Sequence, residues 1–123
     1  MKSDVIGRQR DVMSKNGLDA LVASSPENFA YTTGFVVPSQ PLMRWRHHMA
    51  VVTVDGRTAL LAVDMEESTV RKLAPGQDIR VWGEFTDRPM RVLAALLTDL
   101  GLASARVGIE FDYLPAGDFA ELR

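Results

Sequence analysis

The pattern of apolar and polar positions predicts a chain that alternates helices with strands. Residues 4–16 carry two pairs of apolar side chains seven residues apart, a spacing that places them on one stripe of an amphipathic helix. These side chains are Val5, Ile6, Val12 and Met13. Ser3 can cap the start of this helix and Gly17 can end it. The nearly continuous apolar run at 18–23 follows, and it predicts a strand covered on both faces.

Turn residues organise the next part of the chain. Ser25 and Pro26 supply an N-cap and a first-turn proline for a short helix, and Gly34 would end it. Residues 35–48 form the longest irregular stretch. The strand-like runs at 49–55 and 58–63 then flank an Asp-Gly pair, so we expect an antiparallel hairpin there.

The second half of the chain continues the alternation. Asp64 and Glu67 have capping-box spacing for a helix that runs to about Leu73, and 79–82 has the alternation of a short strand. Asp87 can cap a helix whose leucines recur at helical spacing. Those leucines are Leu93, Leu96, Leu97 and Leu100, with Gly101 after them.

A last strand at 106–111 and the start of a helix at 115–123 complete the series. The whole pattern predicts an α/β fold: a mixed, mostly parallel sheet with one antiparallel hairpin and helices on both faces. We expect a single domain over 1–123, because no linker or repeat divides the chain.

Composition narrows the function classes. The 123 residues include 14 Lys and Arg against 16 Asp and Glu, a net charge of −2 that gives little attraction for nucleic acid or anionic lipid. Without cysteine, disulfides, thiolate metal sites and cysteine nucleophiles are excluded. Neither a signal peptide nor an apolar run of about 20 residues is present, so we expect a cytoplasmic protein without a membrane partner.

The titratable residues form no complete catalytic site. His47 and His48 are adjacent, so on a strand they would point to opposite faces and could not readily share a metal ion. Helix capping accounts for the acidic cluster at Asp64, Glu66 and Glu67 without a metal ion. We therefore expect no catalytic residue, metal ligand or cofactor in this chain.

Two further groups give weak signals. Glu110 and Asp112 flank a strand end and share one face, but they lack a histidine or a third acid. Ser24 and Ser25 lie at a strand-to-helix turn without the glycines of a nucleophile elbow, so Ser25 is more simply a cap. The glycines are isolated and form no phosphate-binding loop.

The segment Arg44-Trp45-Arg46-His47-His48 is the best candidate for ligand contact. Guanidinium groups pair with carboxylates in bidentate fashion, and functional residues favour long loops. Arg44, Trp45, Arg46 and His47 are therefore the substrate-proximal candidates. The alternative is a loop whose tryptophan packs on the sheet edge while both arginines stay solvated.

Two motifs resemble the amino-terminal domain of the creatinase, prolidase and aminopeptidase P family. The first runs from Gly17-Leu18-Asp19-Ala20-Leu21-Val22 into Ser25-Pro26-Glu27-Asn28-Phe29-Ala30-Tyr31-Thr32-Thr33-Gly34-Phe35. The second covers the Asp55-Gly56 hairpin with Leu60-Leu61, then Val107-Gly108-Ile109-Glu110 and Leu114-Pro115. The resemblance thus extends over almost the whole chain.

This resemblance implies a fragment of a longer polypeptide, whose carboxy-terminal pita-bread domain is absent here. In the family that domain holds two divalent metal ions, expected to be Mn, Co or Zn, through two Asp, one His and two Glu. The implied partners are the missing domain and a second subunit in a homodimer. By the same analogy, the 38–48 loop would restrict access to an active site of its own or the partner subunit.

Three functions remain open from the sequence. The first is a non-catalytic accessory and oligomerisation domain of a metal-dependent Xaa-Pro peptidase-like hydrolase. The second is the amino-terminal domain of a creatinase-like amidinohydrolase. The third is a stand-alone module that binds a carboxylate ligand through the 38–48 loop.

Overall fold

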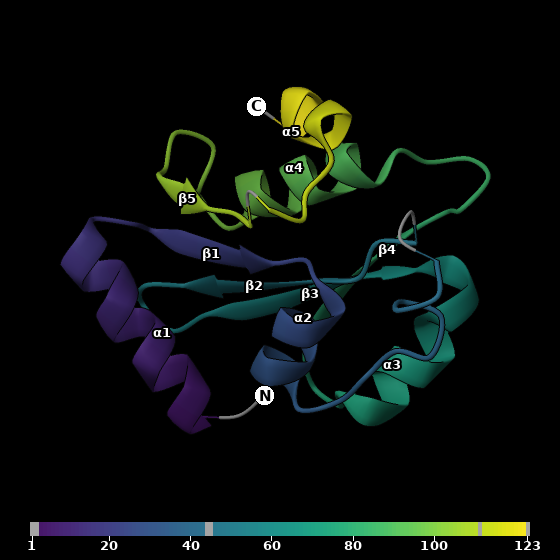
Figure 1. The fold of residues 1–123 in the computed structure, drawn as a ribbon, viewed down its shortest axis with the longest axis horizontal. Coiled ribbons are helices and arrows are strands. Elements are labelled where there is room, and N and C mark those ends of the chain that lie inside the picture. The colour runs from purple at the N-terminus through teal and green to yellow at the C-terminus, as the bar shows by residue number, and fades with distance from the viewer. Residues whose placement is uncertain (1–2, 44–45, 111, 123) are drawn as a thin grey trace.

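The computed structural model describes residues 3–43, 46–110 and 112–122, which fold around one five-stranded sheet (Figure 1). The strands, in the order in which they lie in the sheet, are β4 (Asp78–Trp82), β3 (Thr58–Val63), β2 (Met49–Thr53), β1 (Ala20–Ala23) and β5 (Val107–Gly108). The helices are α1 (Ser3–Asn16), α2 (Pro26–Thr33), α3 (Glu67–Leu73), α4 (Pro89–Asp99) and α5 (Ala116–Leu122), with a 3-10 turn at Asp64–Glu66.

The mixed sheet confirms the expected α/β fold class. β1 pairs with β5 and β3 pairs with β4 in parallel, whereas β2 is antiparallel to both β1 and β3. The hairpin forms where it was expected, with Met49 opposite Leu61 and Gly56 at a φ of 93° in the turn. β2 is also antiparallel to β1, so two of the four strand pairings are antiparallel and two are parallel.

Helices cover both faces of the sheet, as the alternation predicted (Figure 1). α4 and α5 lie on one face and α1, α2 and α3 on the other. On the α4 face, Met49, Val51, Leu61 and Val63 pack with the leucines of α4. On the opposite face, Ala50, Leu60 and Ala62 pack with side chains of α2 and α3. The period-2 alternation of the strands therefore supplies two cores from one sheet.

The second helix has the caps that its sequence predicted. The Ser25 hydroxyl accepts a hydrogen bond from the Asn28 N–H at 3.1 Å, and Pro26 occupies the first turn. At the other end, Gly34 adopts a φ of 89° and donates its N–H to the Ala30 carbonyl. Only glycine adopts this left-handed conformation without strain, so it ends the helix.

Two predicted caps are wrong. The Asp64 carboxylate accepts the Glu84 N–H at 3.4 Å, and the Asp87 carboxylate accepts the Gly83 N–H at 2.7 Å. Neither α3 nor α4 has a side-chain cap. Both acids instead hold the turn that follows β4, because tertiary packing brings its amides within reach.

Two other expectations also need correction. Val12 was expected on the buried stripe of the first helix, but it is 53% exposed, and α1 buries only a narrower stripe that includes Val5 and Met13. The last strand covers only Val107–Gly108 of the expected 106–111, and residue 111 lies outside the described residues. Within the described residues, no helix has the length and apolar character needed to cross a membrane.

Candidate functional site

The loop between α2 and β2, residues 35–48, is fixed from its interior. Gln40 is 2% exposed, and its side-chain amide donates to the carbonyls of Ser24, at 3.3 Å, and His48, at 2.9 Å. Val37 is fully buried in the core on the α2 side. The loop is therefore packed against the sheet, while Val36 and Leu42 expose apolar side chains to solvent.

Arg46, one of the substrate-proximal candidates, is already paired. Its Nε lies 2.7 Å from Oε1 of Glu84, and the two side chains are only 16% and 9% exposed. Its Nη2 also lies 3.4 Å from the Met65 sulfur. The guanidinium is thus occupied within the domain, so it is not free to form a bidentate pair with a ligand carboxylate. Arg44 and Trp45, the neighbouring candidates, lie outside the described residues.

His47 links the loop to two other elements. Its ring is 5% exposed, and Nε2 lies 2.8 Å from the Asp118 carboxylate on α5. Its backbone carbonyl accepts the indole N–H of Trp82 in β4 at 2.9 Å. Among the described residues, its buried Nδ1 has no hydrogen-bond partner. The contact between Nε2 and Asp118 holds the loop against α5.

His48 faces a different part of the molecule. Nδ1 lies 3.2 Å from the Arg46 carbonyl, and Nε2 accepts the Val63 N–H of β3 at 3.3 Å. This donor and acceptor pattern is that of neutral imidazole. Burial lowers the pKa of His48 to about 4, helped by the nearby charges of His47 and Arg46 and opposed by the hydrogen bond to the Arg46 carbonyl. Both rings are buried, and neither offers a free metal-binding face.

Glu110 is the functional group whose role the sequence did not reveal. One carboxylate oxygen accepts the backbone N–H of Ser24 at 2.5 Å and of Ser25 at 2.8 Å, and also the Ser24 hydroxyl. The other accepts the Asn28 side-chain amide at 2.6 Å. Glu110 therefore clamps the start of α2, whereas Asp112 is exposed in a turn.

These hydrogen bonds determine the ionisation of Glu110. Burial alone raises the pKa of this carboxyl, but the hydrogen bonds from the serine turn and from Asn28 outweigh that effect and lower the pKa below its usual range. The carboxylate also lies at a helix N-terminus, where negative charge is favourable. Glu110 is held as a structural anion by four hydrogen bonds from the start of α2 and the serines before it.

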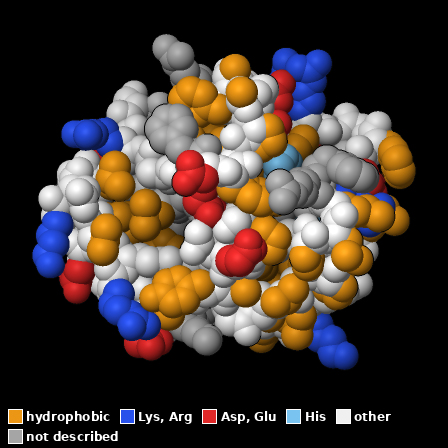
Figure 2. Space-filling model, viewed as in Figure 1, with side chains coloured by type: hydrophobic (Ala, Val, Ile, Leu, Met, Phe, Trp, Pro, Cys, Tyr) orange, Lys and Arg blue, Asp and Glu red, His pale blue; other side chains and the backbone are white. Residues whose placement is uncertain are grey.

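The described residues do not fit a resident metal centre. No group of three or more His, Asp or Glu side chains within them is placed to hold a metal ion. The acidic residues at 64–67 have separate partners: Asp64 accepts the Glu84 N–H, and Glu67 forms an ion pair with Arg71. Cationic side chains lie around the rim of the face in Figure 2 and form no single patch there.

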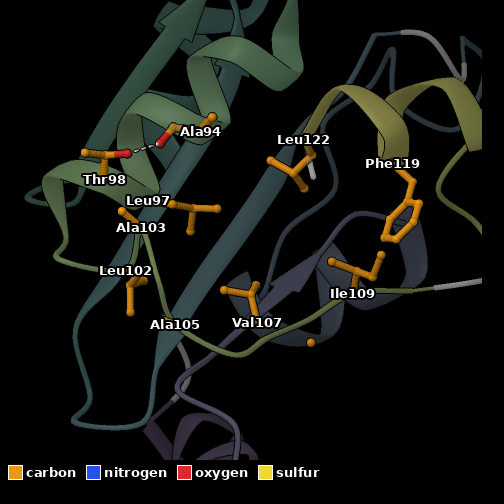
Figure 3. A pocket seen from close by; sticks show the side chains of 11 residues that line it. Ala94, Leu97, Thr98, Leu102, Ala103, Ala105, Val107, Ile109, Phe119 and Leu122 are labelled. Carbon is orange, nitrogen blue, oxygen red and sulfur yellow. Dashed lines mark hydrogen bonds between the residues drawn. The ribbon is translucent and has the colours of Figure 1, made fainter.

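An apolar groove of about 600 Å³ lies between α4, β5 and α5 (Figure 3). Leu97 and Leu102 point into it from one side, and Phe119 and Leu122 from α5 on the other. None of the lining residues is ionisable. The groove can therefore bury apolar groups, but it offers no charged group for catalysis.

Comparison with known proteins gives one family match and several structural matches. The model of the creatinase/prolidase N-terminal domain matches residues 6–123. The N-terminal domain of an X-Pro dipeptidase from Streptococcus pyogenes is 20% identical with a TM-score of 0.78, and the match covers 98% of this chain and 86% of that one.

Two other solved structures extend this comparison. The N-terminal domain of Xaa-Pro dipeptidase from Lactobacillus brevis has a TM-score of 0.80 at 18% identity, with 95% of this chain and 84% of that chain covered. Xaa-Pro dipeptidase from Bacillus anthracis has a TM-score of 0.76 at 16% identity, with 97% of this chain but 30% of that chain covered. No curated protein sequence matches the chain.

Replacing Glu110 with Gln is expected to lower the free energy of unfolding at pH 7 by about 1–3 kcal/mol, since charged hydrogen bonds to buried amides are lost. Because the pKa of Glu110 is lowered in the folded state, its stabilisation is present above the usual carboxyl pKa and is lost as pH falls through the folded value. Urea unfolding of both proteins should therefore show a difference that narrows in acid. Asp112→Asn, at an exposed turn, is the matched control and should change little; an equal loss in both variants would contradict the clamp.

His48 is expected to make the free energy of unfolding depend on pH over a different pH interval. Its lowered pKa means that its stabilisation is complete above pH 6.5 and declines as pH falls toward about 4, with a slope of up to about 1.4 kcal/mol per pH unit. In urea unfolding between these pH values, His48→Gln should remove most of this slope, and His47→Gln, which keeps His48, should retain it. An unchanged slope in His48→Gln would show that His48 is not the responsible group.

Proposed function

Because the chain belongs to the creatinase/prolidase N-terminal domain family, we propose that it is the non-catalytic accessory and oligomerisation domain of a metal-dependent Xaa-Pro peptidase-like hydrolase. The family match over residues 6–123 is the observation that carries this proposal. The solved domains from Streptococcus pyogenes and Lactobacillus brevis, which share the fold, are parts of Xaa-Pro dipeptidases.

Catalysis, in this proposal, takes place in a second domain. The described residues contain no cluster that fits a metal centre, and Glu110, the best-placed carboxylate, is occupied at the start of α2. Two divalent ions, Mn, Co or Zn, would be held by the catalytic domain. The chain spans only 30% of the Bacillus anthracis dipeptidase, so a catalytic partner of larger size is consistent with the comparison.

In this proposal, the 35–48 loop is the part of the domain that contacts the catalytic partner. Gln40 and His48 hold it from inside, so its exposed side chains keep a defined position. Leu42 is 82% exposed on this loop, and Met65 and Phe85 are 58% and 88% exposed close to the Arg46–Glu84 pair. Exposed apolar side chains of this kind favour protein contact.

Exposed apolar side chains such as Leu42 can restrict which substrates reach an active site. In a homodimer, the loop of one subunit would border the catalytic site of its own or the partner subunit and exclude longer peptides by its bulk. A cytoplasmic location is part of the same proposal.

The structure bears differently on the two alternative functions. A creatinase-like amidinohydrolase would use the same amino-terminal domain, so only the catalytic domain distinguishes it from a peptidase. A stand-alone carboxylate-binding module is disfavoured because Arg46 is already paired with Glu84. Saturable calorimetric binding of Ala-Pro or creatine to the isolated chain, abolished by Arg46→Ala, would favour that module instead.

The proposal predicts that the purified chain hydrolyses neither Ala-Pro nor creatine with added Mn²⁺, Co²⁺ or Zn²⁺, because the part of the chain that the structure describes contains no cluster that could hold a metal ion. In the polypeptide that carries the catalytic domain, Leu42→Ser should change the ratio of kcat/KM for Xaa-Pro dipeptides and longer peptides by about tenfold, which corresponds to about 1.4 kcal/mol. Hydrolysis followed by proline release measures both.

Leu73→Ser is the matched control, since Leu73 is 48% exposed on α3, outside the 35–48 loop. It should leave the substrate ratio unchanged. Metal-dependent hydrolysis by the purified chain would overturn the accessory role if it persisted after repurification and in the presence of inhibitors of common proteases. Equal effects of the two leucine substitutions would overturn the role of the loop alone.

A further inference from the structure

Met65 differs from the other described methionines in its access to solvent. The chain has six methionines, of which Met1 lies outside the described residues. Three are fully buried: Met13, Met49 and Met90. Met43 is partly buried, whereas Met65 is 58% exposed on the 3-10 turn Asp64–Glu66. An oxidant in water therefore reaches the sulfur of Met65 more readily than that of the other four.

The sulfur of Met65 also lies beside a cationic donor that is held in place. Nη2 of Arg46 is 3.4 Å from this sulfur, while Nε of the same guanidinium lies 2.7 Å from Oε1 of Glu84. The side chains of Arg46 and Glu84 are only 16% and 9% exposed. Because the guanidinium is planar and rigid, its pairing with Glu84 also fixes the direction of Nη2.

The sulfur is a poor acceptor for this donor. A thioether accepts only weak hydrogen bonds, whereas a charged N–H group forms its strong hydrogen bonds with oxygen. Oxidation of methionine to the sulfoxide adds an oxygen to the sulfur and converts an apolar side chain into a polar one. At Met65 that oxygen would be within reach of the Arg46 guanidinium.

We propose that Met65 is an oxidation site for hydroperoxides, and that Arg46 binds the resulting sulfoxide oxygen through Nη2. In the reaction with hydrogen peroxide, a lone pair of the sulfur attacks one peroxide oxygen, an S–O bond forms and the O–O bond breaks. The sulfur is oxidised by two electrons. The second peroxide oxygen takes these electrons, together with the proton of the transferred oxygen, and leaves as water.

The sulfoxide would add a link between two segments of the domain. Arg46 belongs to the 35–48 loop and Glu84 follows β4, whereas Met65 lies on the 3-10 turn after β3. A hydrogen bond from Nη2 to the sulfoxide oxygen ties the loop to the 3-10 turn and leaves the pair with Glu84 intact. This modification does not depend on the proposed function, because it needs only the described domain and a peroxide.

Limited treatment of the 123-residue chain with hydrogen peroxide, followed by peptide mass mapping, tests the site. Met65 should be oxidised about tenfold or more faster than the fully buried methionines, because burial excludes the oxidant. It should also be oxidised faster than the partly buried Met43.

NMR of the Arg46 guanidinium in the ¹⁵N-labelled chain tests the hydrogen bond. After oxidation its N–H signals should shift and exchange with water more slowly, because a stronger acceptor holds them. Met65→Leu keeps an apolar side chain of similar size but lacks the sulfur, so peroxide should leave these signals unchanged. Met43→Leu, which removes the partly buried sulfur of the 35–48 loop, is the matched control and should retain the change.

Four results would overturn the inference. They are oxidation of another described methionine as fast as Met65, Arg46 signals that stay unchanged when Met65 is oxidised, a signal change that persists in Met65→Leu, and loss of the folded circular dichroism spectrum at the peroxide dose that oxidises Met65. The second result would show that the contact with the sulfur is packing alone. None of these results bears on the hydrolysis assays, so the proposed function can stand or fall separately.

Discussion

The anchoring of Glu110 on the first turn of α2 is the interaction on which the arrangement of this domain depends. It joins residues 24–28 to a residue more than 80 positions later, across the end of β1. The amides at a helix start need acceptors that the helix itself does not provide, and a half-buried carboxylate needs donors. Each group satisfies the other, so α2 has one defined direction relative to the sheet.

The same turn determines the position of the 35–48 loop. The Ser24 carbonyl, next to the Glu110 contact, accepts from Gln40, which also binds the carbonyl of His48. His47 then connects the loop to α5 through Asp118. A continuous set of hydrogen bonds therefore runs from α2 through the loop to the last helix, and the exposed side chain of Leu42 projects from a supported segment.

The domain presents two kinds of apolar surface. The 35–48 loop exposes Leu42 near the buried Arg46–Glu84 ion pair, whereas α4, β5 and α5 line an apolar groove. Both surfaces can bury apolar groups.

Local chemistry in the sequence determined the elements. The Asp-Gly pair specified the hairpin, Ser25 with Pro26 and Gly34 specified both ends of α2, and strand alternation specified the two-faced sheet. The family resemblance also rested on these local motifs. Such features depend on neighbours in sequence, so a single sequence can reveal them.

Only the tertiary structure decided which polar side chains meet. Asp64 and Asp87 have the spacing of helix caps, yet both bind amides of another turn. The sequence suggested that Arg46 could bind a ligand, but its guanidinium is paired with Glu84. Glu110 was considered with Asp112 as an acidic pair, but its carboxylate binds the start of α2. A carboxylate binds the nearest donors in space, and those donors lie far away in sequence, so residue spacing alone did not determine these partners.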